Sequence, residues 1–342
     1  MTDRLSADDR LATILLCTRL GLSRGAAEKP LETREWNRLV RAMLATGMAR
    51  PADLLGRSAT ELREMLDLAE LGGAEPAAER IATLLQRGVA VASELQRLAD
   101  VGVWVVARSD DAYPSRLRAR LGDTRPPVFF GAGPRSLLDT GGVAVVGSRD
   151  VAEAGQRFAA AVGQAAGRCG ETVVSGGARG VDRLAMEGAV AVGGAAVGIL
   201  ADSLVKWLRD AALRRAIVDE SLVLATTLKP DAGFDVGNAM ARNRLIYTLA
   251  DRAVVVASDL GKGGTWAGAT ENLKHGWVPL FARAEPDAPA GNAELLRRGA
   301  VPVHDADLDD AGDLFDRLDA RAAEREADPA APGGPPTQPK LL

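Results

Sequence analysis

The sequence predicts an α/β protein, with an extended Rossmann-like, doubly wound and mostly parallel sheet that is preceded by a small all-helical domain. Three observations carry this prediction. Before about residue 100, apolar side chains recur at helical spacing, as at Leu62, Met65 and Leu66. After Gly102, short apolar runs alternate with helical patterns, which is typical of parallel strands covered on both faces. Two of these runs pass through glycine turns into helical patterns, in VAVVGSRDVAEAG and TVVSGGARGVDRLA.

The N-terminal domain is expected to cover residues 1–100 as several short helices. Its helical pattern is interrupted at Gly47, Pro51, Gly72 and Pro76, and glycine and proline are strong helix breakers. A chain of 342 residues is long enough for one main domain with a smaller partner. For this helical domain, a role in packing alone is an equal alternative to a chemical one.

The sheet domain is expected over residues 101–305. Its strands are predicted at Trp104–Ala107, Val143–Val146, Thr172–Val174, Ala196–Leu200, Leu222–Ala225, Ala253–Ala257, Pro279–Phe281 and Val301–Val303. Its clearest helices are predicted at Arg157–Arg168, Arg183–Val192, Leu208–Val218 and Asn243–Ala250. Residues 306–342 are acidic and then rich in Pro, Ala and Gly. From Ala320 onward this tail has too few apolar side chains to offset the entropy of ordering, so we expect it to be partly disordered.

Composition excludes several classes of protein. A net charge of −4 excludes a general basic coat for nucleic acid, so any contact with DNA must be local. Two cysteines, Cys17 and Cys169, and two histidines, His275 and His304, argue against a disulfide scaffold, a zinc site or a histidine-dependent triad. The sequence shows neither a signal peptide nor a run of about 18 apolar residues. We expect a cytoplasmic protein with no metal, no cofactor, no catalytic group and no membrane contact.

Three glycine-rich loops follow predicted strands, and ligands of open parallel sheets bind beyond the carboxyl ends of the strands. The first loop is Gly147-Ser148-Arg149. A helix start offers unpaired N–H groups to an anion, and an arginine offers a planar fork that fits phosphate. This loop therefore predicts a phosphate contact, with a capped turn and a surface arginine as an equal alternative.

The second loop is SGGARGVD at 175–182, and its three closely spaced glycines suggest that something approaches its backbone closely. The residues expected to contact a phosphate-bearing ligand are Ser175, Gly176, Gly177, Arg179 and Gly180. Asp182 falls in the first helical turn, where a carboxylate can accept backbone N–H bonds. We expect Asp182 to support the loop rather than to act as an acid, because no second carboxylate or histidine is placed to share its proton.

The third loop, Lys262-Gly263-Gly264-Thr265, follows the strand pattern AVVVAS. A Walker A sequence would need glycine at Val256 and a hydroxyl residue at position 263, so ATP hydrolysis by that machinery is not expected. A contact between Lys262 and phosphate is predicted, with a solvated loop lysine as an equal alternative.

Arg242, Asn243 and Arg244 are predicted to open a helix, where they can grip phosphates or tie loops together. We expect one of the arginines to be internal and paired with an acid such as Asp182, because a buried charge requires compensation. Trp266 stands beside the third loop, where it can stack a base or belong to the core.

Together these motifs resemble one family. GSR at 147–149, SGGARGVD at 175–182, RNRLI at 242–246 and GGTWAGA at 263–269 occur in the order found in the DNA-processing protein A family, also called DprA or Smf. The resemblance covers about residues 102–281. It implies a cytoplasmic, non-enzymatic protein that binds single-stranded DNA through these loops, forms a homodimer and helps to load a RecA-type recombinase during DNA uptake.

This chain departs from the family pattern in TTLKPDAGFDVGNAMARNR, where the family commonly has a Ser-Glu pair followed by FPxRNR. The sequence after His304 also shows no pattern of a winged helix. A second hypothesis is a nucleotide sensor or a phosphoribohydrolase-like enzyme of the same superfamily. Those enzymes carry a PGGxGTxxE loop, whereas Glu271 comes too late after Gly264-Thr265. A third hypothesis is a structural partner domain whose pocket is vestigial.

Overall fold

The computed structural model describes residues 2–23, 25–69, 77–310 and 312–327. The chain divides into two compact units. The first unit contains Met1–Ala132 and Thr226–Ala232, and the second contains Gly133–Ala225 and Gly233–Leu342. The fold class is the one that the sequence predicts, because short helices come first and a parallel sheet with helices between its strands follows.

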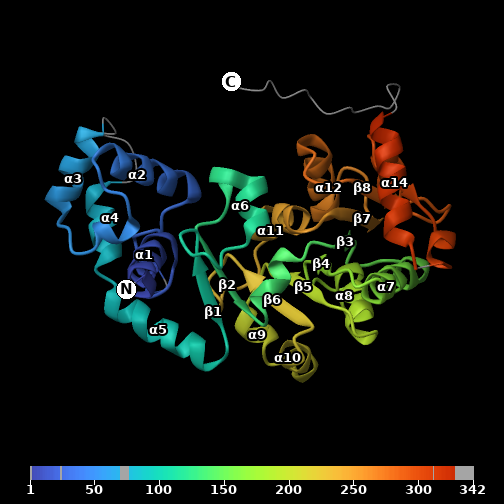
Figure 1. Ribbon diagram of the computed structural model, residues 1–342, viewed down its shortest axis with the longest axis horizontal. Helices are drawn as coiled ribbons and strands as arrows, with labels where there is room; N and C mark the ends of the chain where they lie inside the picture. The colour runs from blue at the N-terminus through green and yellow to red at the C-terminus, as the bar shows by residue number, and fades with distance from the viewer. Residues whose placement is uncertain (1, 24, 70–76, 311, 328–342) are drawn as a thin grey trace. The chain divides into compact units, whose positions relative to one another are not determined.

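The first unit is built mainly from helices (Figure 1). They are α1 (Thr2–Cys17), α2 (Thr33–Ala45), the 3₁₀ turn Pro51–Leu54, α3 (Ala59–Leu68), α4 (Ala78–Leu85) and α5 (Gly88–Asp100). Apolar side chains from these helices, such as Trp36, Leu39, Leu62 and Ile81, form one buried cluster. The helices exist because each one buries an apolar stripe against its neighbours.

The first unit also contains a pair of antiparallel strands, β1 (Trp104–Ala107) and β2 (Val128–Ala132). Between them lie α6 (Ser115–Leu121) and the 3₁₀ turn Gly122–Thr124. Strand β2 is not among the strands that the sequence predicts, although all five of its residues are buried. Its short VFFGA run directly follows Pro126-Pro127, and periodicity alone does not identify so short an apolar segment as a strand.

Parallel strands form the sheet of the second unit. They are β3 (Val143–Gly147), β4 (Val173–Ser175), β5 (Ala196–Ile199), β6 (Leu222–Thr226), β7 (Arg252–Ala257), β8 (Leu280–Arg283) and β9 (Val301–Val303). Their spatial order is β6-β5-β4-β3-β7-β8-β9, and each neighbouring pair is parallel. The order reverses at β3, which lies between β4 and β7. This reversal is where an open parallel sheet leaves a crevice for a ligand.

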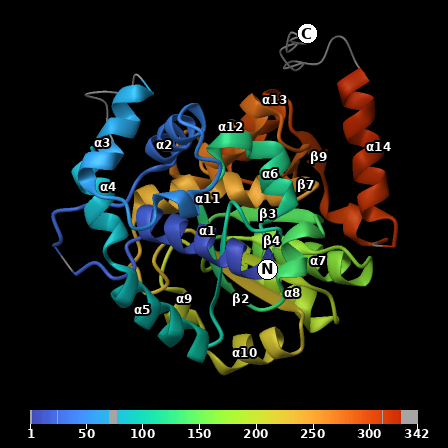
Figure 2. The ribbon, with the colours of Figure 1, turned by 60° about the vertical axis from the view of Figure 1, so that its left-hand side comes forward.

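Helices of the second unit cover both faces of its sheet, with α7 and α8 on one face and α11 and α12 on the other (Figures 1 and 2). The elements of this unit between and after the strands are the 3₁₀ turn Arg135–Asp139, α7 (Glu153–Arg168), α8 (Val181–Ala191), α9 (Leu204–Trp207), α10 (Ala211–Val218), α11 (Val236–Leu249), α12 (Gly263–His275), α13 (Ala290–Arg297), the 3₁₀ turn Asp305–Leu308 and α14 (Leu314–Ala327). Among the described helices, none is both long and apolar enough to cross a membrane.

Two glycines let α7 and α8 approach each other at backbone distance. A Cβ atom added at Gly163 of α7 would lie 2.1 Å from the carbonyl oxygen of Ala185 in α8. A Cβ atom at Gly188 of α8 would lie 2.5 Å from the carbonyl oxygen of Ala160 in α7. The contact between these helices therefore requires hydrogen atoms at both positions.

The disorder expected from Ala320 onward is wrong for residues 320–327, which continue α14. Leu314, Phe315 and Leu318 are buried and anchor the helix, and the alanines that follow favour helical backbone. The rest of the expected tail, residues 328–342, lies outside the described residues.

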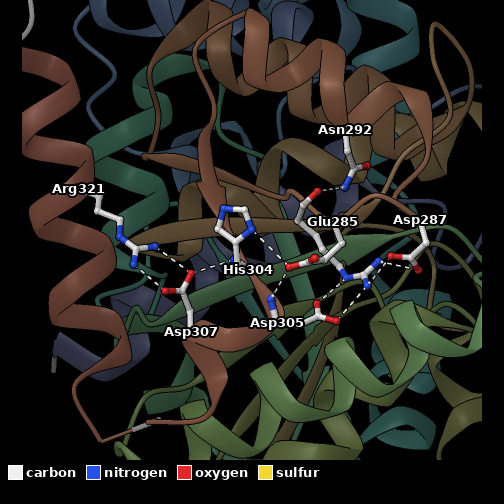
Figure 3. Close-up of polar contacts among 8 residues, drawn as sticks. Glu285, Asp287, Asn292, His304, Asp305, Asp307 and Arg321 are labelled. Carbon is white, nitrogen blue, oxygen red and sulfur yellow. Dashed lines mark hydrogen bonds and ion pairs between the residues drawn. The ribbon is translucent and has the colours of Figure 1, made fainter.

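Ion pairs fix the edge of the sheet and the last helix (Figure 3). Arg283 of β8 is buried and bridges Asp287 at 2.8 Å and Asp305 at 2.9 Å. Arg321 of α14 pairs with Asp307 at 2.6 Å, and this hydrogen bond holds the pKa of Asp307 below its ordinary value. The acidic segment after β9 is thus ordered by arginines rather than merely solvated.

Candidate functional site

A cavity of about 510 Å³ opens in the second unit at the point where the strand order reverses. The ends of β3 and β7 supply part of its lining, at Val146, Gly147 and Ala257. The other walls come from the loop after β3, from α11 and from the start of α12. The first and third glycine loops, which are more than 100 residues apart in the sequence, therefore face one space.

Asp182, in the first turn of α8, is buried at this cavity. Its carboxylate accepts hydrogen bonds from the backbone N–H groups of Ala178, Gly176 and Gly147. Burial raises the pKa of Asp182 to about 6, while the Arg242 guanidinium acts in the opposite direction. One carboxylate thus ties the ends of β3 and β4 to the start of α8.

The raised pKa of Asp182 predicts a pH dependence of stability. The folded protein holds this proton up to about pH 6, whereas the unfolded chain releases it near 3.8. Protonation of Asp182 therefore stabilises the folded state at low pH, and this stabilisation is lost as pH rises from about 4 to about 6. Each unit of difference between the folded and unfolded pKa corresponds to about 1.4 kcal/mol. Urea unfolding of the wild type and of Asp182→Asn across this range measures the change in the free energy of unfolding. The wild type should lose its relative stability with rising pH, and parallel profiles would contradict the assignment.

Arg242 is buried against the same corner of the cavity. Its guanidinium donates a hydrogen bond to the carbonyl oxygen of Ile199 at the end of β5. Burial lowers the pKa of Arg242, and the charge of Asp182 opposes this shift more than that of any other carboxylate. A Cβ atom at Gly176 would lie 1.8 Å from the guanidinium of Arg242. The glycine is therefore needed to make room for an arginine of the protein itself.

Arg242, Asn243 and Arg244 do not open a helix, which corrects the sequence prediction. Helix α11 begins earlier, at Val236, because Asp235 caps it by accepting a hydrogen bond from the N–H of Asn238 at 3.0 Å. The three residues therefore lie in the middle of α11, where backbone N–H groups are already used. Asn243 lines the cavity and donates to the carbonyl oxygen of Gly264 at 2.8 Å, which ties α11 to the start of α12. Half-buried Arg244 is not part of the lining.

The glycines of the second loop are crowded by the protein's own atoms. Gly180 has a positive φ, and a Cβ atom there would lie 2.5 Å from the carbonyl oxygen of Arg149 and 2.6 Å from that of Ser148. Gly177 also has a positive φ and faces Trp207. Buried Ser175 donates its hydroxyl hydrogen to the carbonyl oxygen of Val145 at 2.6 Å. The close approach expected at this loop is therefore internal packing, and the Gly147, Gly176 and Ala178 amides bind Asp182.

The start of α12 is the part of the cavity that offers backbone amides to an anion. Lys262 is its N-cap residue and makes no side-chain cap, so the first N–H groups of the helix, from Gly263 to Thr265, lack a capping side chain. These residues line the cavity together with Arg149, whose guanidinium lies 4.8 Å from the centre of the Phe234 ring. Both cationic side chains are exposed. The cationic side chains at the mouth of the cavity thus come from the first and third loops, and one exposed carboxylate, Asp259, also lines it.

An apolar wall faces the same cavity, and the sequence analysis does not predict it. Phe234, Val236 and Met240 line the cavity while 49%, 65% and 45% of each residue is exposed. Large apolar side chains so exposed on one concave surface indicate a ligand-binding surface. The signal in the sequence is the GFDVGNAM stretch at 233–240, where apolar residues stand among glycine and aspartate shortly before Arg242.

Arg179 lies outside the cavity. Its exposed side chain pairs with Asp150 at 2.7 Å and lines a second hollow, which shares Arg149 with the cavity. Trp266 is half-buried, and Arg298 lies over its ring at 5.0 Å, so a residue of this chain already stacks on it. The structure thus gathers Gly147, Ser148, Arg149, Asp182, Arg242, Asn243 and Lys262 to Thr265 around one cavity.

Residues 104–311, more than half of the chain, match the DNA recombination-mediator protein A family. The chain belongs to this family. Among relatives of known name, Smf of Escherichia coli (strain K12) is 28% identical over 204 residues, covering 58% of this chain and 54% of that protein. The DNA processing protein DprA of Mycobacterium tuberculosis (strain H37Rv) is 31% identical over 234 residues, covering 63% of this chain and 59% of that protein.

Among solved structures, DNA processing protein A from Streptococcus pneumoniae has the same fold, with a TM-score of 0.61. It is 20% identical in sequence, and the match covers 80% of this chain and 95% of that chain. This chain spans less than two thirds of the length of the Smf and DprA relatives. The resemblance drawn from the four motifs is therefore confirmed at the level of family and fold.

Proposed function

We propose that this member of the DNA recombination-mediator protein A family binds single-stranded DNA in the cavity between β3, α11 and α12. The observation that carries the proposal is the chemistry of the cavity lining, which combines cationic side chains and open helix amides with exposed apolar side chains. Arg149, Lys262 and the first amides of α12 are suited to a phosphate, and the exposed apolar side chains of Val236 and Met240 are suited to contact with a base. A nucleotide has both of these chemical parts.

The size of the cavity favours a single strand over a duplex. A volume of about 510 Å³ falls in the range of about 300–1,000 Å³ that is usual for pockets holding one small ligand. Bases of a duplex are stacked and paired, and a base must leave the stack before it can enter such a pocket. A strand with unpaired bases meets this requirement at no such cost.

A role in DNA recombination or uptake belongs to the same proposal and is supported by the family. Presentation of the DNA to a RecA-type recombinase, formation of a homodimer and a cytoplasmic location follow from the family resemblance. We propose these properties as the setting in which the cavity works. The presentation of DNA is tested by mixing the protein with a RecA-type recombinase and single strands, and by measuring how fast the recombinase assembles on them.

The double substitution Arg149→Ala and Lys262→Ala is expected to weaken binding to oligothymidylate at least tenfold in low salt. Each phosphate contact contributes a slope of about 0.7 in the logarithm of affinity against the logarithm of salt, so the slope should fall by about 1.4. Fluorescence anisotropy over a salt series, with single-stranded and duplex oligonucleotides, measures both quantities. Lys274→Ala, at the opposite end of α12, is the matched control and should bind like the wild type. Equal affinities for all three proteins would contradict the proposal.

We further propose that the site binds without catalysis. Asp182 is enclosed by backbone amides and Arg242, so its carboxylate is engaged in holding the loops. The alternative, a phosphoribohydrolase-like enzyme, predicts release of free base from nucleoside monophosphates. We expect no free base by chromatography after prolonged incubation, and time-dependent release that is lost in Asp182→Asn would favour the enzyme.

A further inference from the structure

A second hollow of about 650 Å³ lies beside the cavity in the second unit, between the start of α7 and α8. Arg149 lines both spaces, so the hollow and the cavity meet at this side chain. Two further arginines, Arg179 and Arg183, line the hollow together with Gln156.

Both carboxylates that line the hollow are already paired with its arginines. Asp150 accepts from Arg179 at 2.7 Å, and Glu187 accepts from Arg183 at 2.7 Å. These pairs are open to solvent, with side-chain exposures of 76% and 86% for the first and 51% and 52% for the second. Exposed ion pairs stabilise a protein by only about 0–1 kcal/mol, so another anion can replace the carboxylate at little cost.

The charges in the hollow favour an anion overall. Three guanidinium groups face two carboxylates there, and Arg149 has no carboxylate partner among the described residues. Helix α7 also begins at this hollow, and its N-cap residue, Ala152, has no side chain that can cap the first N–H groups. The hollow thus combines the guanidinium groups of arginines with the open N–H groups of a helix start, and it is exposed to solvent. These features suit the phosphodiester backbone of a nucleic acid.

We propose that this hollow is a second phosphate-binding subsite, which holds the stretch of DNA backbone adjoining the nucleotide in the cavity. The strand passes over Arg149 and continues along Arg179 and Arg183, whose guanidinium groups exchange Asp150 and Glu187 for phosphate oxygens. This inference rests on the proposed function, because the strand is the same one that occupies the cavity. It extends the interface beyond the glycine loops and onto the exposed side of α8.

The test is the affinity for oligothymidylates from about 2 to about 12 nucleotides long, measured by competition against a labelled strand. Arg183→Gln should bind the shortest strands like the wild type and lose about three- to tenfold in affinity for the longest, with a salt slope lower by about 0.7. Glu187→Gln frees Arg183 from its partner and should tighten only the longer strands. Arg157→Gln is the matched control, because Arg157 is an exposed arginine of α7 with a similar pair to Glu153.

The outcomes separate this inference from the proposed function. If Arg183→Gln and Arg157→Gln bind alike at every length while the Arg149 and Lys262 double variant is defective, the second subsite is wrong and the cavity stands. If Arg183→Gln weakens the shortest strands as much as the longest, the subsite is likewise overturned. If the wild type binds no strand of any length, the proposed function itself fails.

Discussion

Asp182→Ala is expected to lower the free energy of unfolding by about 3–5 kcal/mol, because each buried donor that loses its acceptor costs about 1–3 kcal/mol. The amides of Gly147, Gly176 and Ala178 lose their acceptor, and the buried guanidinium of Arg242 loses its largest favourable charge interaction. Urea denaturation followed by circular dichroism at neutral pH measures the change.

Two further variants make this result specific to the buried carboxylate. Asp182→Asn keeps an acceptor oxygen in place and should lose less stability than the alanine variant. Asp150→Ala removes an exposed carboxylate of the neighbouring loop and should leave stability nearly unchanged. If Asp182→Ala and Asp150→Ala unfold at the same urea concentration, Asp182 does not hold the loops together.

Gly163→Ala is expected to cost about 2–3 kcal/mol of stability, although one methyl group is added to a helix that alanine ordinarily favours. The added Cβ atom would lie 2.1 Å from the carbonyl oxygen of Ala185, so α7 and α8 must move apart. The measurement is again urea denaturation. Gly233→Ala in the same unit has open space around the added atom and should change stability by less than about 0.5 kcal/mol. Equal stabilities of the two variants would show that the helices can separate freely.

The sequence predicts the parallel sheet well because its strands are short apolar runs buried on both faces, and such runs stand out between helical patterns. The start of α11 is predicted wrongly, because the GFDVGNAM stretch has no clear helical pattern, although Asp235 caps a helix there. The difference is physical, since a capping side chain and tertiary packing can establish a helix over residues of weak propensity.

The candidate site is predicted in part, and the reason is again physical. Glycine turns and arginines are visible in the sequence, so the first and third loops are found. The atoms that fill the space beside a glycine can come from residues far away in the chain, as the Arg242 guanidinium does at Gly176. The apolar wall at Phe234 is not predicted, because the type of a residue does not tell whether its side chain is buried in the core or exposed in a cavity.

The carboxylate that joins the loops after β3 and β4 also has a consequence for evolution. The loops at this corner are joined by Asp182, Arg242 and their backbone partners, whereas the exposed lining of the cavity comes from side chains of other segments, such as Lys262 and Phe234. Substitutions in those segments can retune affinity or ligand preference without disturbing the scaffold. A protein of this architecture can therefore acquire a new ligand by exchanging a few surface side chains while Asp182 and Arg242 stay in place.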